Sequence, residues 1–416
     1  MSAGAAKPGA ARIAVINTHP IQYFAPLYAA LNRADDIDIT ALYLSDFSLR
    51  GAMDKGFGRE VTWDIDLLEG YRSKFVGRNW RTIEPGGFTS MVVPALIGEL
   101  SRDRYDAVWI HGHGNAAAFV ALAAARLKGL PVFMRGDSNP LLPRSRAKSV
   151  LRRPLIGALY AACTGLLAVG SANRDYYRAM GVPDSKITLV PYAVDNDRFV
   201  RASQVTAAER TAMRQRLGVN DDAPIILYAS KFQWWKHPDD LLEAFLRIRA
   251  RGVAAHLVFV GSGDLEAKLR AAAADEPNVH FPGFFNQSDL PHVFAASDLF
   301  ALPSSIEPWG LIVNEVMCAG LPVVVAREVG CVPDLVHEGV NGAIFAAGDI
   351  GALAAALERI AGDATLRTNM GPQSRRIIDH WSFRECLTGL REALAKAGVR
   401  PRASSSPSLA ASTPIS

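Results

Sequence analysis

Two glutamates near one expected helix start are well placed to bind a polar ligand. Glu307 lies in a polar loop after an apolar strand that ends near Leu302, and Glu315 lies inside the helix expected between about Gly310 and Gly320. A glycine just past a helix commonly ends it, and the free N–H groups at a helix start attract anions. Carboxylates at these places can accept hydrogen bonds from sugar hydroxyls while the intervening amides hold a phosphate. The alternative is that both are solvated surface acids.

Two lysines bring positive charge to a second loop. Lys231 and Lys236 are five positions apart, between an expected strand at 224–229 and an expected helix at 239–251. Two cations in this position suit a diphosphate whose negative charge grows as the group attached to it departs. A pair of ordinary surface lysines is the alternative.

Two glycines and a phenylalanine follow neighbouring expected strands. Gly261 and Gly263 form a Gly-x-Gly turn after residues 256–260, and Phe284 follows residues 279–281. The turn lacks the third glycine of a dinucleotide fingerprint, which counts against a nicotinamide dehydrogenase. For Phe284, the alternative is the end of an apolar strand.

The first half of the chain offers its own polar candidates at strand ends. His111 and His113 lie in a His-Gly-His-Gly loop, and His113 is preferred for the cleft because it is nearer the helix start. Arg135 and Asp137 follow the next strand, as cleft residues or as a structural ion pair, and His19 lies in the first loop. No third ligand is spaced near the two histidines, so we expect no metal.

Apolar runs alternate with helix-like segments twice along the chain, which positions these residues. This alternation predicts two α/β units, each a doubly wound parallel sheet. Ligands of such sheets bind beyond the carboxyl ends of the strands, so we expect one cleft between the units. The expected divisions are a first domain at 11–190, a second at 200–380, a helix at 381–398 packing back on the first domain, and disordered tails at 1–10 and 401–416.

Residues 302–325 resemble the E-x7-E signature of the retaining glycosyltransferases of family 4, which have the GT-B fold of two Rossmann-like domains. Seven residues separate the two glutamates, and Pro-Trp-Gly-Leu, Gly-Leu-Pro and Val-Val-Val elements surround them. The resemblance implies that Glu307 contacts the transferred sugar and Glu315 the ribose hydroxyls. It also places Trp309, Gly310 and Leu311 at the donor.

The lysine segment resembles the same family with two departures. Lys231 replaces the usual arginine, which keeps the charge and loses the bidentate geometry, and His237 replaces the usual glycine. By resemblance, Gly261 and Gly263 form the turn near the nucleotide, and Phe284 belongs to the segment whose backbone contacts the base. A histidine at position 111 or 113 would contact the transferred sugar or the acceptor hydroxyl.

The resemblance implies a hexosyltransferase that moves a sugar, with retention, from a nucleotide-diphosphate-sugar bound by the second domain to an acceptor bound by the first. The first loop, residues 17–20, replaces a Gly-rich loop of the family, which leaves its role open. No carboxylate of the first unit stands out as a nucleophile, so a front-face displacement is expected rather than a covalent intermediate. A saccharide or lipid-linked saccharide would be the acceptor, in cell-surface polysaccharide or glycolipid synthesis. The alternatives are an epimerase or phosphorylase of the same fold, or a non-catalytic nucleotide-sugar-binding subunit.

Composition narrows the setting. A net charge of +4 over 416 residues is too mild for a nucleic-acid binder. Four scattered cysteines and the lack of a signal-like or membrane-spanning run favour a cytoplasmic protein. The basic stretch at 144–153 is either an amphipathic contact with an anionic membrane or a solvated helix face. Two D-x-D strings, at 64–66 and 195–197, are interpreted as strand alternation and linker rather than metal sites.

Overall fold

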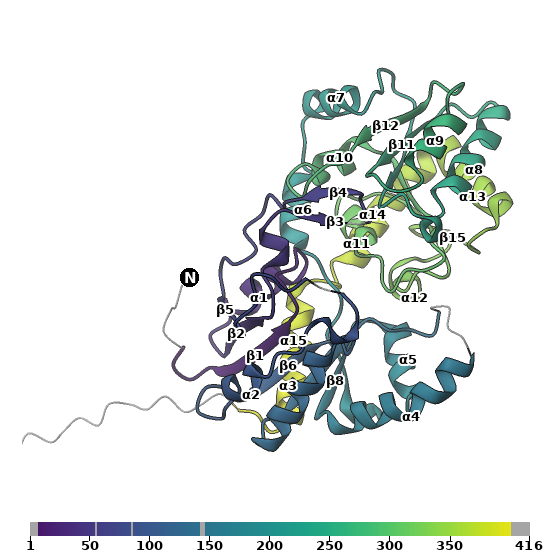
Figure 1. Ribbon diagram of the computed structural model, residues 1–416. Helices are drawn as coiled ribbons and strands as arrows, with labels where there is room; N and C mark the ends of the chain where they lie inside the picture. Colours follow the sequence, from purple (N-terminus) through teal and green to yellow (C-terminus); the bar gives the residue numbers. More distant parts are fainter. Residues whose placement is uncertain (1–6, 55, 85, 142–145, 401–416) are drawn as a thin grey trace, which may run out of the picture.

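The computed structural model describes residues 7–54, 56–84, 86–141 and 146–400, which form two bodies joined side to side (Figure 1). The parts of the expected tails at 1–6 and 401–416 lie outside the described residues. Residues 7–10 are packed onto the first body: Ala10 is buried, and Lys7 Nζ donates to the Ala34 carbonyl at 2.9 Å. Residues 7–10 therefore belong to the first body rather than to the tail expected at 1–10.

The first body is built on seven parallel strands in the order β5-β2-β1-β6-β7-β8-β9. The central strands are buried on both faces, which is why they appear in the sequence as continuous apolar runs. Helices α1 and α15 pack on one face, and α3 and α4 pack on the other. The strands are β1 (Ala11–Asn17), β2 (Ile37–Tyr43), β5 (Arg72–Phe75), β6 (Ala107–His111), β7 (Val132–Gly136), β8 (Gly165–Ala168) and β9 (Ile187–Leu189).

The second body is built on six parallel strands in the order β12-β11-β10-β13-β14-β15. Two sheets of this kind confirm the predicted doubly wound α/β fold. The strands are β10 (Ile225–Ala229), β11 (His256–Val260), β12 (Val279–Gly283), β13 (Leu299–Leu302), β14 (Val323–Ala326) and β15 (Gly342–Phe345).

The helices cover both sheets. Those of the first body are α1 (Phe24–Leu31), α2 (Ala95–Glu99), α3 (Ala116–Leu127), α4 (Arg146–Ala162) and α5 (Ser171–Ala179). Those that follow are α6 (Asn196–Ala202), α7 (Ala207–Arg216), α8 (Pro238–Ala250), α9 (Glu266–Ala272), α10 (Leu290–Ala296), α11 (Leu311–Cys318), α12 (Val332–Leu335), α13 (Ile350–Gly362), α14 (Ala364–Ile378) and α15 (Phe383–Lys396). None of the helices in the described part of the chain is both long and apolar enough to cross a membrane.

The chain crosses between the bodies twice. It leaves the first body after β9 and returns after α14, so that α15 lies against the first sheet, with Cys386 and Leu390 in its core (Figure 1). Asn196 ties the two crossings together, because its Nδ2 donates to the Ile378 carbonyl at 2.9 Å. This hydrogen bond thus fixes the two crossings to one another.

An antiparallel hairpin, β3 (Ala52–Asp54) and β4 (Arg59–Val61), extends from the first body to the junction (Figure 1). It was not expected from the sequence. The D-x-D string at 64–66 follows the hairpin and lies in a loop, so the strand expected there was wrong. Asp64 accepts hydrogen bonds from Ser288, and Asp66 Oδ1 accepts one from Leu68 N at 2.8 Å. In the second string, Asp195 caps α6, so a helix begins inside the segment interpreted as linker.

Candidate functional site

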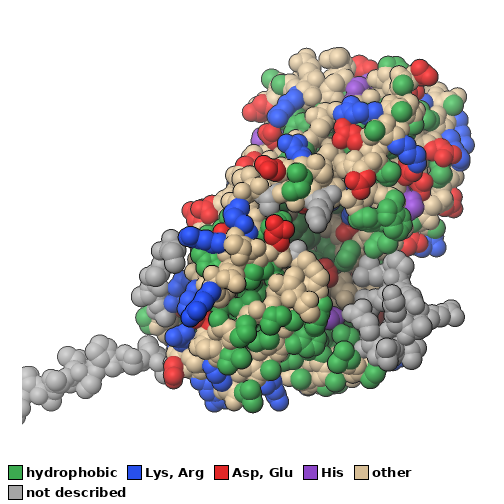
Figure 2. Space-filling view, in the orientation of Figure 1, with side chains coloured by type: hydrophobic (Ala, Val, Ile, Leu, Met, Phe, Trp, Pro, Cys, Tyr) green, Lys and Arg blue, Asp and Glu red, His purple; other side chains and the backbone are tan. Residues whose placement is uncertain are grey.

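A cavity of about 490 Å³ opens between the two bodies (Figure 2). Strands β10, β11 and β12 of the second body end beside it, as does β7 of the first. Apolar and polar side chains of both bodies form its walls. Those used below are Tyr23, Asp54, Phe57, Asp137, Lys231, Lys236, Gly261, Phe284, Gln287, Glu307, Trp309, Gly310, Leu311 and Glu315.

Helix α11 and the loop before it bring the two glutamates to this cavity. It starts after Gly310, whose φ of +93° favours glycine and where a Cβ would lie 2.9 Å from Val329 Cγ1, and Gly320 follows its end. Glu307 lies in the loop before the helix and forms an ion pair with Lys236. Glu315 lies one to two turns into the helix and is only 1% exposed.

The carboxyl group of Glu315 is buried and not fully hydrogen-bonded within the described part of the chain. Its Oε1 has no hydrogen-bond partner among the described residues. Burial raises the pKa of Glu315 to about 8, although the charge of Arg198 opposes the shift. At neutral pH the side chain is therefore mostly protonated and able to donate as well as accept a hydrogen bond.

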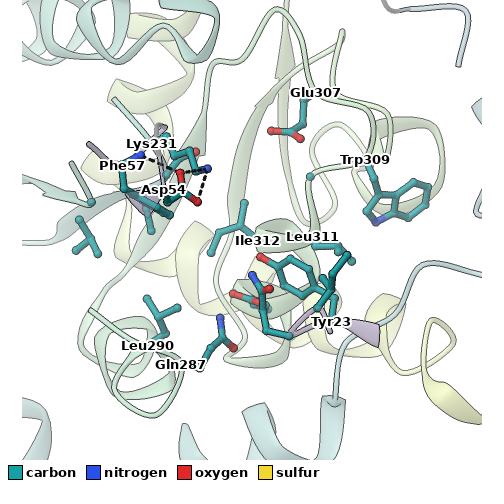
Figure 3. A pocket seen from close by; sticks show the side chains of 18 of the residues that line it. Tyr23, Asp54, Phe57, Lys231, Gln287, Leu290, Glu307, Trp309, Leu311 and Ile312 are labelled. Atoms are coloured by element: carbon teal, nitrogen blue, oxygen red, sulfur yellow. Dashed lines mark hydrogen bonds and ion pairs between the residues drawn. The ribbon is translucent and has the colours of Figure 1, made fainter. Parts of the chain in front are cut away.

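The two lysines reach the cavity from one loop but have different partners. Lys236 ends a short 3₁₀ turn, and its ammonium contacts Glu307 within the same body. Lys231 Nζ lies 2.8 Å from Asp54 Oδ1, across the junction (Figure 3). Burial acts to raise the pKa of Asp54, but the hydrogen bond and charge of Lys231 outweigh it and hold that pKa below its usual value.

The backbone at His237 shows why glycine is the usual residue at this position of the family pattern. His237 has φ +50°, a left-handed conformation that a glycine adopts without strain. Its ring offsets that cost with two contacts of 2.9 Å, Nδ1 to Asp240 and Nε2 to Ser305. The second contact ties the lysine loop to the loop that carries Glu307.

The Gly-x-Gly turn packs against backbone. Gly261 has φ +132°, and a Cβ there would lie 2.1 Å from the Ser230 carbonyl oxygen. Gly263 has φ +154° and lies against Phe232 rather than lining the cavity. Phe284 lines the cavity and meets the Phe57 ring edge to face, with ring centroids 5.1 Å apart.

The expected histidines lie outside the cavity wall. The Nε2 of His111 is 2.8 Å from the Tyr28 hydroxyl, and the centroids of the His111 and Phe24 rings are 4.3 Å apart. Burial and, to a lesser extent, the charge of Arg135 lower the pKa of His111. His113 faces Tyr160 instead, with 3.5 Å between Nδ1 and the hydroxyl.

Of the remaining candidates of the first body, Asp137 lines the cavity, and Arg135 and His19 do not. Burial, helped by the nearby charge of Glu307, raises the pKa of Asp137. Arg135 is 1% exposed and donates to the backbone carbonyls of Val190 and Pro191, so it supports the first crossing instead of pairing with Asp137. His19 packs on Phe47 away from the cavity, where burial lowers its pKa to about 4.

Sequence reasoning missed several of the cavity residues, among them Tyr23, Asp54, Phe57 and Gln287. Tyr23 lies beside Leu311, at the side of the cavity across from Lys231 and Asp54, whereas Trp309 points away (Figure 3). The glycines around Phe57 are a hairpin signal that could have revealed β3 and β4. No pattern in the sequence near this hairpin indicates that it contacts the second body.

One group in the described part of the chain has side chains able to hold a metal ion, and it consists of His237, Asp239 and Asp240. Asp239 also pairs with Lys268 at 2.9 Å, and His237 is held by Ser305 as described above. The group lies at the start of α8, beside the lysine loop. It does not line the cavity.

Two family models match the chain and together take in most of it. A glycosyl transferase 4-like domain matches residues 20–193, and a model of the glycosyl transferases group 1 matches residues 209–377. The chain belongs to the family 4 type of GT-B glycosyltransferases. The predicted resemblance is confirmed.

Curated relatives of this glycosyltransferase are similar over part of their length. The sulfoquinovosyl transferase SQD2 of Arabidopsis thaliana is 26% identical over 74% of this chain and 59% of its own. A GDP-mannose-dependent phosphatidylinositol monomannoside mannosyltransferase of Corynebacterium glutamicum is 30% identical over 47% of this chain and 52% of its own. The chain thus spans little more than half the length of these two relatives.

Solved structures share the fold more completely. The Anabaena HepE protein in complex with UDP and glucose superimposes with a TM-score of 0.70 at 18% identity, covering 92% of this chain and 99% of that one. At that identity the likeness concerns the fold alone.

Proposed function

We propose that this glycosyltransferase moves a sugar from a nucleotide-diphosphate-sugar to an acceptor hydroxyl with retention at the anomeric carbon. One observation carries the proposal: Lys231, Lys236, Glu307 and Glu315 all line the cavity at the start of α11. Positive charge, helix-end amides and hydroxyl-binding acids in one place match the chemistry of such a donor.

The leaving diphosphate would be held by the two ammonium groups and the first amides of α11. Both lysines are paired with carboxylates in the free protein, so the site holds its cations in place before the donor arrives. As the glycosidic bond breaks, negative charge grows on the diphosphate, and nearby fixed cations stabilise that charge without reorganising. That the step proceeds without a metal ion stays a prediction.

The glutamates would bind the two sugars of the donor. Glu307, next to Lys236, is the candidate for the transferred sugar, and Glu315, deeper in the cavity, for the ribose. A ribose hydroxyl would supply a partner to the buried Glu315 Oε1, which has none among the described residues.

On the acceptor side, Asp137 is better supported than His113, because it lines the cavity and the imidazole does not. Asp137 is also a carboxylate of the first body, so it must be tested as a nucleophile. We retain the front-face displacement, in which the acceptor hydroxyl attacks from the side that the diphosphate leaves and passes its proton to the departing phosphate. A saccharide or lipid-linked saccharide remains the proposed acceptor.

Thermal stabilisation by candidate donors tests the proposal. UDP-, GDP- and ADP-sugars are added at millimolar concentration, and a true ligand at 100 times its Kd stabilises the folded state by about 2.7 kcal/mol. At least one should raise the melting temperature of the wild type and fail to raise that of Glu307→Ala and Lys236→Ala. If no nucleotide sugar stabilises the wild type, the proposal is refuted.

Product analysis separates the rival functions. An epimerase converts its nucleotide sugar without any acceptor, whereas a transferase needs both substrates. A non-catalytic subunit binds the donor and gives no turnover alone.

Contact with an anionic membrane through residues 144–153 stays a proposal, since the side chains of residues 142–152 lie outside the described part. Replacing the basic residues of this stretch should release the protein from vesicles that contain an anionic lipid. Unchanged sedimentation with those vesicles would refute the contact. The expected cytoplasmic location stays a prediction as well.

A further inference from the structure

The β3–β4 hairpin is a part of the first body that lies in the nucleotide half of the site. Asp54 contacts Lys231 through both carboxylate oxygens, at 2.8 and 3.0 Å. Phe57 lies 4.7 Å from the same ammonium group and 5.1 Å from the Phe284 ring. Asp54 and Phe57 of the hairpin thus lie beside Lys231 (Figure 3), and Phe57 also contacts Phe284, the residue expected near the base.

Backbone contacts hold the hairpin there. Ser262 Oγ donates to the Phe57 carbonyl at 2.7 Å, and Gln233 Nε2 donates to the Gly56 carbonyl at 3.1 Å. A Cβ on Gly56 would lie 2.5 Å from Lys231 Cδ, so the lysine side chain in this position uses the space that the glycine leaves.

The Asp54 carboxylate contacts the Lys231 ammonium group in the way that a phosphate group of the donor would. A carboxylate and a phosphate both offer negatively charged oxygens, and both line up on an ammonium at hydrogen-bond distance. Asp54 and Lys231 both line the cavity, so an anion that binds Lys231 there comes next to the Asp54 carboxylate. Like charges so close repel, which favours exchange over sharing.

We propose that Asp54 occupies, in the free protein, the place on Lys231 that the donor diphosphate takes, while Phe57 stays over the nucleoside. This inference rests on the proposed function. It makes the hairpin an element of the donor site supplied by the first body, with Asp54 as a competitor of the diphosphate and Phe57 as a positioning residue.

Calorimetric titration with UDP and GDP tests the exchange. Asp54→Asn should lower the Kd for the nucleoside diphosphate that binds, by roughly two- to fivefold, since breaking a partly exposed pair such as this one costs little. The Kd for the corresponding nucleoside, which lacks phosphate, should stay the same. Asp54→Glu, which restores the carboxylate, should return the Kd toward the wild-type value.

Asp64→Asn is the matched control. Asp64 fastens the segment after the same hairpin to Ser288 and does not line the cavity, so its removal loosens the hairpin without freeing Lys231. A Kd that falls equally in both variants would show that loosening alone is responsible and would overturn the proposal. An unchanged or higher Kd in Asp54→Asn would overturn it as well.

Nucleoside diphosphate binding by the wild-type protein distinguishes a failure of this inference from a failure of the proposed function. If wild-type protein binds UDP or GDP and the Asp54 variants do not shift the Kd, only the exchange is refuted. If the wild type binds neither of them, nor ADP, the donor site itself is refuted, and the exchange with it.

Discussion

Replacing Glu315 with glutamine should stabilise the protein increasingly as the pH rises. Glu315 is buried in α11, and burial raises its pKa from the usual 4.5 to about 8. Between these two values the folded protein holds a proton that the unfolded chain has released. Unfolding then releases that proton, so the free energy of unfolding falls as the pH rises.

The magnitude follows from the shift. Each pH unit within the window changes the free energy of unfolding by about 1.4 kcal/mol per proton, so the penalty between pH 5 and pH 8 reaches about 4 kcal/mol. Glutamine has nearly the same shape and no charge, so it escapes this penalty. For a body of this size, such a difference corresponds to a melting temperature change on the order of 10 °C.

Thermal unfolding of both proteins at pH 5, 6, 7 and 8 measures the effect. The melting temperature of Glu315→Gln minus that of the wild type should rise steadily with pH and level off above pH 8. Glu243→Gln, which removes a half-exposed glutamate from α8, controls for the loss of a carboxylate in a helix. A difference for Glu315→Gln that is flat with pH, or that falls, would show that the buried acid ionises normally.

Three further perturbations test the rest of the site. Gly261→Ala should lower the melting temperature by many degrees, since φ is +132° and a Cβ would clash with backbone, whereas Gly98→Ala, with nothing within 4 Å, should not. Lys236→Ala should reduce transfer by about 10²- to 10³-fold, and Lys268→Ala, which removes an exposed cation, should leave the rate unchanged. Asp137→Asn should give a product of unchanged anomeric configuration by NMR; an inverted product, or trapping of a glycosyl adduct on Asp137 in the wild type, would refute the front-face displacement.

The sequence predicted the parts of the fold that bury apolar residues in unbroken runs. Strands β1, β10 and β11 were expected within a residue of their ends, because parallel strands covered on both faces leave such runs. The short polar strand β5 was not expected, since it is stabilised by pairing with the edge of β2 rather than by its own residues. Local pattern does not contain that information.

Within the site, residues carried on one element were predicted better than residues that meet across elements. The spacing of Glu307 and Glu315 is a property of α11 and the loop before it. The orientation of His111 depends on Tyr28, 83 positions away, and the partner of Lys231 is 177 positions away. Nothing near either residue in the sequence indicates those partners.

The two lysines show how one loop can respond to a ligand in two ways. Lys236 is neutralised by Glu307 of its own body, so a diphosphate that binds it rearranges contacts inside that body only. Lys231 is neutralised by Asp54 of the other body, so the same diphosphate changes a contact between the bodies. Because binding energies are linked, anything that pulls the hairpin away from Lys231 must alter donor affinity, and donor binding must alter the junction. The Asp54–Lys231 pair therefore couples the position of the hairpin of the first body to the binding of the phosphate.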